Sequence, residues 1–145
     1  MIDSLAGYRS PSMISDTELG ESLNTFIAQT LNALSTPGSN APAFFADPDI
    51  AVSGSALGEH FMGIEAAQRG IALVAASDIQ WEPRLVVSWM RGDIAWAQIR
   101  IDGHTVEDGT SVGVPYEVTG IFHRDEDRWT WLYWGGGEPQ ENSRL

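Results

Sequence analysis

The stretch QWEPRLVVSWM at residues 80–90 is followed by RGD at 91–93 and then by IAWAQIRI at 94–101. Both flanking segments are rich in β-branched and aromatic residues, which favour strands. The second segment also alternates between apolar and other side chains, as expected of a strand with one buried face. Arg-Gly-Asp between them is a tight turn. This part of the chain therefore predicts a long β-hairpin.

Strand-like sequence continues beyond this hairpin. Residues 114–124 and 129–134 have the same composition, and the acidic turn 125–127 separates them. The stretch 102–113 is polar and contains glycine, so we expect a loop there. The C-terminal half of the chain is thus predicted to form a four-stranded antiparallel meander.

Helical patterns fill the chain before the meander. Ser15 and Glu18 fit a capping box, with the serine at N-cap and the glutamate at N3, and Pro37-Gly38 ends the helix that follows. A second helix is predicted from Gly63 to Ser77-Asp78. Between the helices we expect a short helical segment at 41–46 and short strands at 50–53 and 59–62. Helices that precede an antiparallel sheet indicate the α+β class.

Composition excludes several kinds of chemistry. The chain has 145 residues, no cysteine and no lysine, so disulfides, thiolate metal sites and Schiff-base chemistry are excluded. Eight arginines against twenty carboxylates give a formal charge of −12, which disfavours nucleic acid and anionic membranes as partners. We expect neither a cofactor nor a metal ion.

The sequence predicts one domain without targeting segments. Residues 1–15 are interpreted as an N-terminal arm, 16–139 as the domain and 140–145 as a tail. The first fifteen residues lack the apolar core of a signal peptide, and no apolar run is long enough to span a bilayer. We therefore expect a cytoplasmic protein.

Several short motifs carry a family resemblance. They are Phe44-Phe45-Ala46-Asp47 before Ile50-Ala51-Val52, Gly63-Ile64-Glu65-Ala66, Gly92-Asp93-Ile94-Ala95-Trp96, Thr119-Gly120-Ile121-Phe122 with Arg124 and Trp129, and Pro139. In this order and spacing they resemble the SnoaL-like branch of the nuclear-transport-factor-2-like superfamily, which includes the ketosteroid isomerase-like fold. The resemblance implies a cone-shaped, curved antiparallel sheet wrapped around N-terminal helices, with an apolar pocket. It also implies a homodimer formed through the exposed face of the sheet.

The chain departs from this family at positions that carry chemistry. Tyr133, Gly135 and Gly137 stand where many SnoaL-like sequences have two histidines and a serine, and Glu117 stands where an arginine is frequent. Gly54 occupies the place of the carboxylate base of ketosteroid isomerases. Glycine has no side chain, so a steroid-isomerase mechanism with that base is not expected.

Six tryptophans on predicted strands are the most unusual feature of the sequence. Indoles on a concave sheet face would bind a flat apolar or aromatic molecule, whereas the alternative is packing in the core or in a dimer interface. Strand alternation predicts Trp129 and Trp131 on one face and Trp134 on the other. The predicted ligand-binding residues are Trp81, Trp89, Trp96, Trp131, Trp134, Phe45, Met62 and Arg84.

Three residues are candidates for acid–base catalysis. His60 could act as a general acid or base, and either Glu117 or Tyr133 could be its partner. Glu117 could itself be a base if it faces a cavity, but an arginine–glutamate pair with Arg84 or Arg100 on the solvent face is the alternative. We therefore expect a protein that binds a small apolar or aromatic molecule. The alternative is a cofactor-independent isomerase, cyclase or dehydratase.

Overall fold

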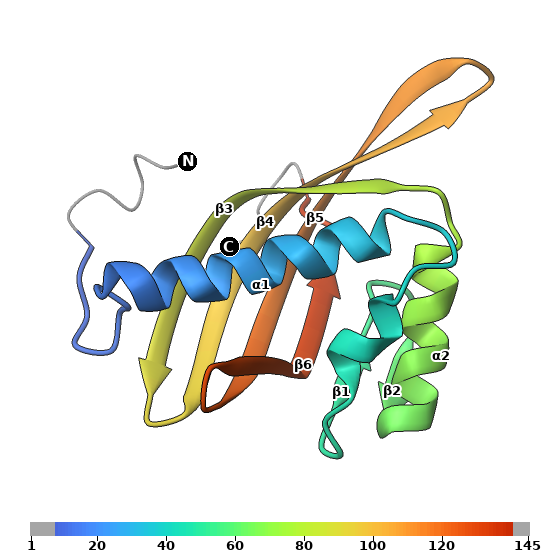
Figure 1. The fold of residues 1–145 in the computed structure, drawn as a ribbon. Helices are drawn as coiled ribbons and strands as arrows, with labels where there is room; N and C mark the ends of the chain where they lie inside the picture. The colour runs from blue at the N-terminus through green and yellow to red at the C-terminus, as the bar shows by residue number, and fades with distance from the viewer. Residues whose placement is uncertain (1–7, 141–145) are drawn as a thin grey trace.

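The computed structural model describes residues 8–140 (Figure 1). Its six-stranded sheet has the order β2-β1-β6-β5-β4-β3, and neighbouring strands are antiparallel except for the parallel pair β1 and β6. The strands are β1 (Ala51–Ser53), β2 (His60–Met62), β3 (Gln80–Arg91), β4 (Ile94–Glu107), β5 (Thr110–Asp125) and β6 (Arg128–Gly137). The predicted meander is confirmed, and β6 extends three residues beyond the predicted end of the last strand at residue 134. Residues 1–7 of the predicted arm and 141–145 of the predicted tail lie outside the described residues.

Helices cover one face of this sheet (Figure 1). They are α1 (Thr17–Leu34), the short 3-10 helix η2 (Ala41–Phe45) and α2 (Ile64–Ala75). The α+β class is therefore confirmed. The sheet is open, with β2 and β3 at its edges, and it is not strongly curled. The cone predicted from the family resemblance is thus only partly formed.

The start of α1 differs from the predicted capping box. Asp16 is the N-cap, and its Oδ1 accepts a hydrogen bond of 2.9 Å from the backbone N–H of Leu19. Aspartate is as good an N-cap as serine, so the helix begins one residue later than the Ser15–Glu18 pattern predicts. Glu18 then lies in the first turn, where its negative charge interacts favourably with the helix dipole and stabilises the helix.

The loop predicted over 102–113 was wrong. Strands β4 and β5 continue through it as a paired hairpin, which projects beyond the rest of the sheet (Figure 1). Asp108 and Gly109 form its tip with φ values of 50° and 77°. Two left-handed residues make the tight turn that matches strand twist, and Asp-Gly is a favoured pair for it.

A bulge in β6 determines the composition of the core. Ile121 pairs with Tyr133 while the next residue, Phe122, pairs with Trp131, so β6 has one extra residue between these pairs. The extra residue brings Trp134 onto the same face as Trp129 and Trp131, and all three are buried. The prediction that Trp134 lies on the opposite face was therefore wrong, because the alternation of side chains is interrupted at the bulge.

The residues before α1 lie along the free edge of β3. The Ile14 N–H donates to the Ser88 carbonyl at 3.0 Å, and the Met90 N–H donates to the Ser12 carbonyl at 2.9 Å. Part of this edge strand is thereby paired. Within residues 8–140, the structure contains no helix long and apolar enough to cross a membrane.

Candidate functional site

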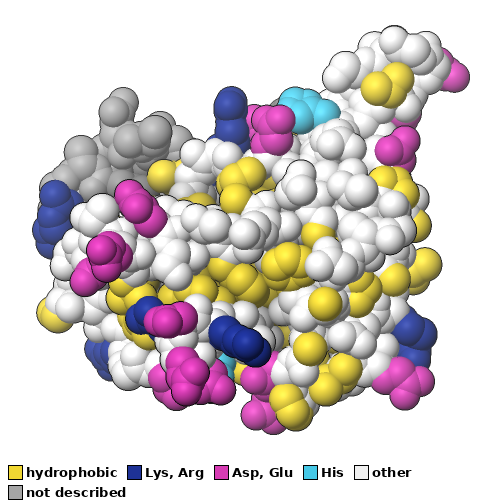
Figure 2. Space-filling model, in the orientation of Figure 1, with side chains coloured by type: hydrophobic (Ala, Val, Ile, Leu, Met, Phe, Trp, Pro, Cys, Tyr) yellow, Lys and Arg dark blue, Asp and Glu magenta, His cyan; other side chains and the backbone are white. Residues whose placement is uncertain are grey.

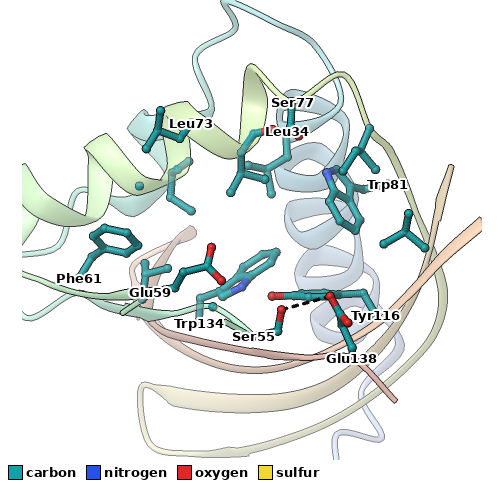
Figure 3. A pocket seen from close by; sticks show the side chains of 17 residues that line it. Leu34, Ser55, Glu59, Phe61, Leu73, Ser77, Trp81, Tyr116, Trp134 and Glu138 are labelled. Carbon is teal, nitrogen blue, oxygen red and sulfur yellow. Dashed lines mark hydrogen bonds between the residues drawn. The ribbon is translucent and has the colours of Figure 1, made fainter. Parts of the chain in front are cut away.

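A cavity of about 330 Å³ lies between α2, the end of α1 and the inner face of the sheet (Figure 3). Leu34, Val52, Ile71 and Val74 contribute aliphatic walls. The aromatic walls are Phe61 from β2, Trp81 from β3 and Trp134 from β6. In the orientation of Figure 1, Figure 2 shows hydrophobic side chains along the edge of α1 and around η2 and β1.

Polar side chains gather at one end of the cavity (Figure 3). They are Ser55 and Glu59 from the turn between β1 and β2, Tyr116 from β5, and Glu138, which directly follows β6. The Ser55 hydroxyl lies 3.4 Å from Oε1 of Glu138. The cavity therefore combines an apolar body with a small acidic end.

Tyr116 stands at the centre of this polar end. Burial raises the pKa of its phenol, and the negative charges of Glu59 and Glu138 raise it further. The polar groups of Trp134 and Ser55 nearby act in the opposite direction on the same pKa. As a neutral phenol, Tyr116 can both donate and accept a hydrogen bond.

The Tyr116 ring occupies space that any side chain at Gly136 would fill. A Cβ atom at Gly136 would lie 2.5 Å from Cζ and 2.8 Å from Cε2 of that ring, and it would overlap the hydroxyl. No such obstacle exists at Gly137, where a Cβ atom would have nothing within 4 Å. The position of the phenol thus depends on a glycine at 136.

Glu59 lies across Gly54, the residue at the family's base position. A Cβ atom at Gly54 would meet Cβ and Oε1 of Glu59 at 2.8 Å. Oε1 of Glu59 also accepts a 2.7 Å hydrogen bond from the Ala56 N–H, which fixes the carboxylate at the cavity. The missing side chain at Gly54 leaves the space that this neighbouring carboxylate fills.

The indole N–H of Trp81 is an unpaired donor beside the cavity. Its Nε1 is buried and has no hydrogen-bond partner among the described residues. The other side of the ring packs on Gly103, where a Cβ atom would lie 2.9 Å from Cζ3. A buried donor without a partner is unfavourable, so a ligand that offers an acceptor here would gain binding free energy.

The structure brings two of the predicted ligand-binding residues, Trp81 and Trp134, to this cavity. Phe45 and Trp131 are instead fully buried in the core, where their rings stack with centroids 5.4 Å apart. Met62 is 78% exposed on β2, and Arg84 forms a surface ion pair of 2.7 Å with Asp102.

Trp89 and Trp96 lie on the outer face of the sheet, opposite the helices. They are cross-strand partners and stack with centroids 6.2 Å apart. Trp96 pairs in turn with Ile121, Ile121 with Tyr133, Tyr133 with Ala51, and Ala51 with Met62. An apolar row, defined by these six residues, therefore crosses the whole outer face.

The three predicted catalytic residues also lie away from the cavity. Tyr133 belongs to the apolar row, and exposed His60 approaches the Ser53 hydroxyl at 3.2 Å on the same outer face. Glu117 accepts hydrogen bonds of 2.6 and 3.1 Å from Arg100. The surface arginine–glutamate pair, the second interpretation of Glu117, is the one observed.

The polar residues of the cavity are ones that the sequence analysis did not select. Tyr116 could have been found from the alternation of β5, because it shares a face with buried Val118 and Phe122. Glu59 and Glu138 gave no comparable signal, since both lie outside regular strands. Within residues 8–140, no group of three or more histidine, aspartate or glutamate side chains is arranged to hold a metal ion.

Comparisons with known proteins identify the fold. No family model matches the chain, and no curated protein matches it either. Solved structures do match. The association domain of Caenorhabditis elegans CaMKII has a TM-score of 0.71 at 13% identity, over 85% of this chain and 98% of that one. The chain has the nuclear-transport-factor-2-like (NTF2-like) fold.

Two bacterial proteins illustrate the range of this NTF2-like fold. One is an NTF2-like protein with a cystatin-like fold from Novosphingobium aromaticivorans, with a TM-score of 0.68 and 14% identity over 87% of this chain and 85% of that one. The other is a proposed dehydratase of the NTF2-like family from Streptomyces avermitilis, with a TM-score of 0.66 and 17% identity over 83% of this chain and 93% of that one. At these identities the likeness concerns the fold alone.

Proposed function

We propose that this protein binds a small apolar or aromatic molecule in the cavity beneath α2. The observation that carries the proposal is a cavity of about 330 Å³ with aromatic walls, Phe61, Trp81 and Trp134, and few polar groups. Small-molecule sites are typically apolar hollows of ~300–1,000 Å³ with a few polar groups that set orientation.

The binding test uses the tryptophans themselves. Trp81 and Trp134 line the cavity, so binding of steroids, polyketides or single-ring aromatic compounds should shift tryptophan emission. Val74→Phe extends a side chain into the cavity and should weaken binding, whereas Ala72→Phe on the exposed side of the same helix should not. Equal affinities of the two variants would place the binding site elsewhere.

A cofactor-independent acid–base enzyme is the second candidate. The observation that favours it is a carboxylate, Glu59, and a neutral phenol, Tyr116, facing one cavity. Glu59 would remove a proton from the substrate, and Tyr116 would donate a hydrogen bond to the oxygen on which negative charge develops. These two residues take the roles first assigned to His60, Glu117 and Tyr133.

Turnover separates the enzyme from the binding protein. A compound that shifts the emission is incubated with the wild type, with Glu59→Gln and with Tyr116→Phe, and its conversion is followed by mass spectrometry. An enzyme would lose conversion in both variants and still bind the compound. A compound that binds tightly but is never converted would favour the binding protein.

We also propose that two copies of the chain associate through the outer face of the sheet. The apolar row from Trp89 to Met62 leaves partly exposed aromatic and aliphatic side chains on every strand, and such residues are enriched in interfaces. Trp96→Glu should yield a monomer in analytical ultracentrifugation, whereas Val106→Glu on the projecting hairpin should not. A wild type that sediments as a monomer at micromolar concentration would contradict this proposal.

A further inference from the structure

The charged side chains of the cavity are all negative. Glu59 and Glu138 line it, and no arginine or histidine does. The whole chain carries a formal charge of −12, so no distant excess of positive charge offsets them. An anionic ligand would be repelled from this end of the cavity.

Neither carboxylate is neutralised by a neighbour. The ion pairs found between residues 8 and 140 join other carboxylates, such as Asp102 and Glu117, to arginine or histidine. Each cavity carboxylate uses only Oε1: Glu59 with the Ala56 N–H at 2.7 Å, and Glu138 with the Ser55 hydroxyl at 3.4 Å. In this part of the chain, Oε2 of both residues therefore has no hydrogen-bond partner.

The negative charges of both carboxylates act on the Tyr116 phenol. Their charges reach the Tyr116 phenol, whose pKa is raised first by burial and then by Glu59 and Glu138. Figure 3 shows Glu59 and Glu138 on either side of Tyr116 and Trp134. A positive group at this end of the cavity would be attracted by both carboxylates and by the indole face of Trp134, because aromatic faces attract cations.

We infer that the ligand is an organic monocation, with an ammonium group at the end of the cavity that Glu59 and Glu138 line and an apolar body against Trp81, Trp134 and Phe61. The inference rests on the proposed binding function and specifies its ligand class. An ammonium has three donors and no acceptor, so carboxylate and phenol oxygens are suitable partners for it.

Three compounds with one apolar body test the charge preference directly. They are 4-phenylbutylamine, 4-phenylbutanol and 4-phenylbutyrate, and their affinities are measured by isothermal titration calorimetry at neutral pH and low salt. The amine is expected to bind roughly tenfold tighter than the alcohol, because a hydrogen bond to a charged group is worth that ratio or more. The butyrate should bind more weakly than the alcohol.

Isosteric variants locate the effect. Glu59→Gln and Glu138→Gln should each weaken amine binding by roughly threefold to tenfold and leave alcohol binding unchanged. Glu18→Gln is the matched control, because it removes the same charge about 24 Å along α1 from the cavity residue Leu34. Circular dichroism shows whether each variant is folded.

The outcomes distinguish the inference from the function on which it rests. An alcohol or butyrate that binds as tightly as the amine overturns the cation inference and supports a cavity that binds apolar molecules. Amine binding that is equally weakened by Glu18→Gln also overturns it, because the effect is then one of net charge. If none of the three compounds binds, the cation inference is overturned as well. Whether the cavity binds apolar molecules is then decided by the affinity of Val74→Phe for the wider panel of compounds.

Discussion

Replacing Gly136 with alanine should displace the Tyr116 ring and destabilise the fold. The new Cβ atom would lie 2.5 Å from Cζ of Tyr116, whereas carbon atoms in contact are ~3.5 Å apart, so the ring must move by about 1 Å. Overpacking of this kind costs roughly 1–3 kcal/mol.

Gly137→Ala is the matched control for this change. A Cβ atom at Gly137 meets nothing within 4 Å, so the substitution should be neutral or slightly stabilising. Urea denaturation gives both free energies of unfolding, and a loss of ~1–3 kcal/mol for Gly136→Ala corresponds to a Tm at least ~2 °C lower. Two variants that agree within ~0.5 kcal/mol would refute the argument.

A double variant tests whether the ring is the cause. Tyr116→Leu removes the atoms that the new methyl group would meet, so Gly136→Ala should cost less in that background than in the wild type. Strict additivity of the two free energies would show that the glycine is needed for another reason.

Three further predictions concern stability. The Thr30 hydroxyl accepts a 3.1 Å hydrogen bond from the buried Trp131 indole N–H, and Thr30→Val removes it. The free energy of unfolding in urea should fall by roughly 1–3 kcal/mol. No change would mean that the indole finds another partner. Asp16→Ala removes the N-cap of α1 and should cost about 1 kcal/mol, while Asp16→Asn should cost almost nothing. The pKa of Tyr116 is raised in the folded state, so the unfolded chain loses this proton first as pH rises. The contribution of this group to the free energy of unfolding should therefore be complete below pH ~10 and be lost as the pH rises further. Tyr116→Phe should therefore unfold with a weaker dependence on pH above ~10, and an identical dependence would contradict the shift.

The fold was predictable because its signals are local and periodic. The hairpin around Arg91-Gly92-Asp93 and the helix beginning near Asp16 follow from spacing within a few residues. The errors arose where one residue changes the pattern. Asp108-Gly109 joins two strands instead of lying in a loop, and the extra residue in β6 turns Trp134 toward the core.

The candidate site was less predictable because it is assembled from distant segments. Glu59 precedes β2 and Glu138 follows β6, so strand alternation does not indicate where either side chain points. Their proximity to Tyr116 depends on the parallel pairing of β1 with β6, which joins segments about 80 residues apart in the sequence. His60 and Glu117 were chosen for their chemical character, but strand alternation places both on the outer face.

The pairing of residues 12–14 with β3 has a consequence for aggregation. Exposed strand edges offer unpaired N–H and C=O groups to other chains, and proteins shield them with short edge strands or covering segments. Here β2, at one border, has only three residues, and Ser12 and Ile14 occupy part of the other border. A chain trimmed to residues 16–139 would leave the Met90 N–H and the Ser88 carbonyl open to intermolecular strand addition. We therefore expect the segment before α1 to protect this edge against fibrillar assembly, although it lies outside the predicted domain boundaries.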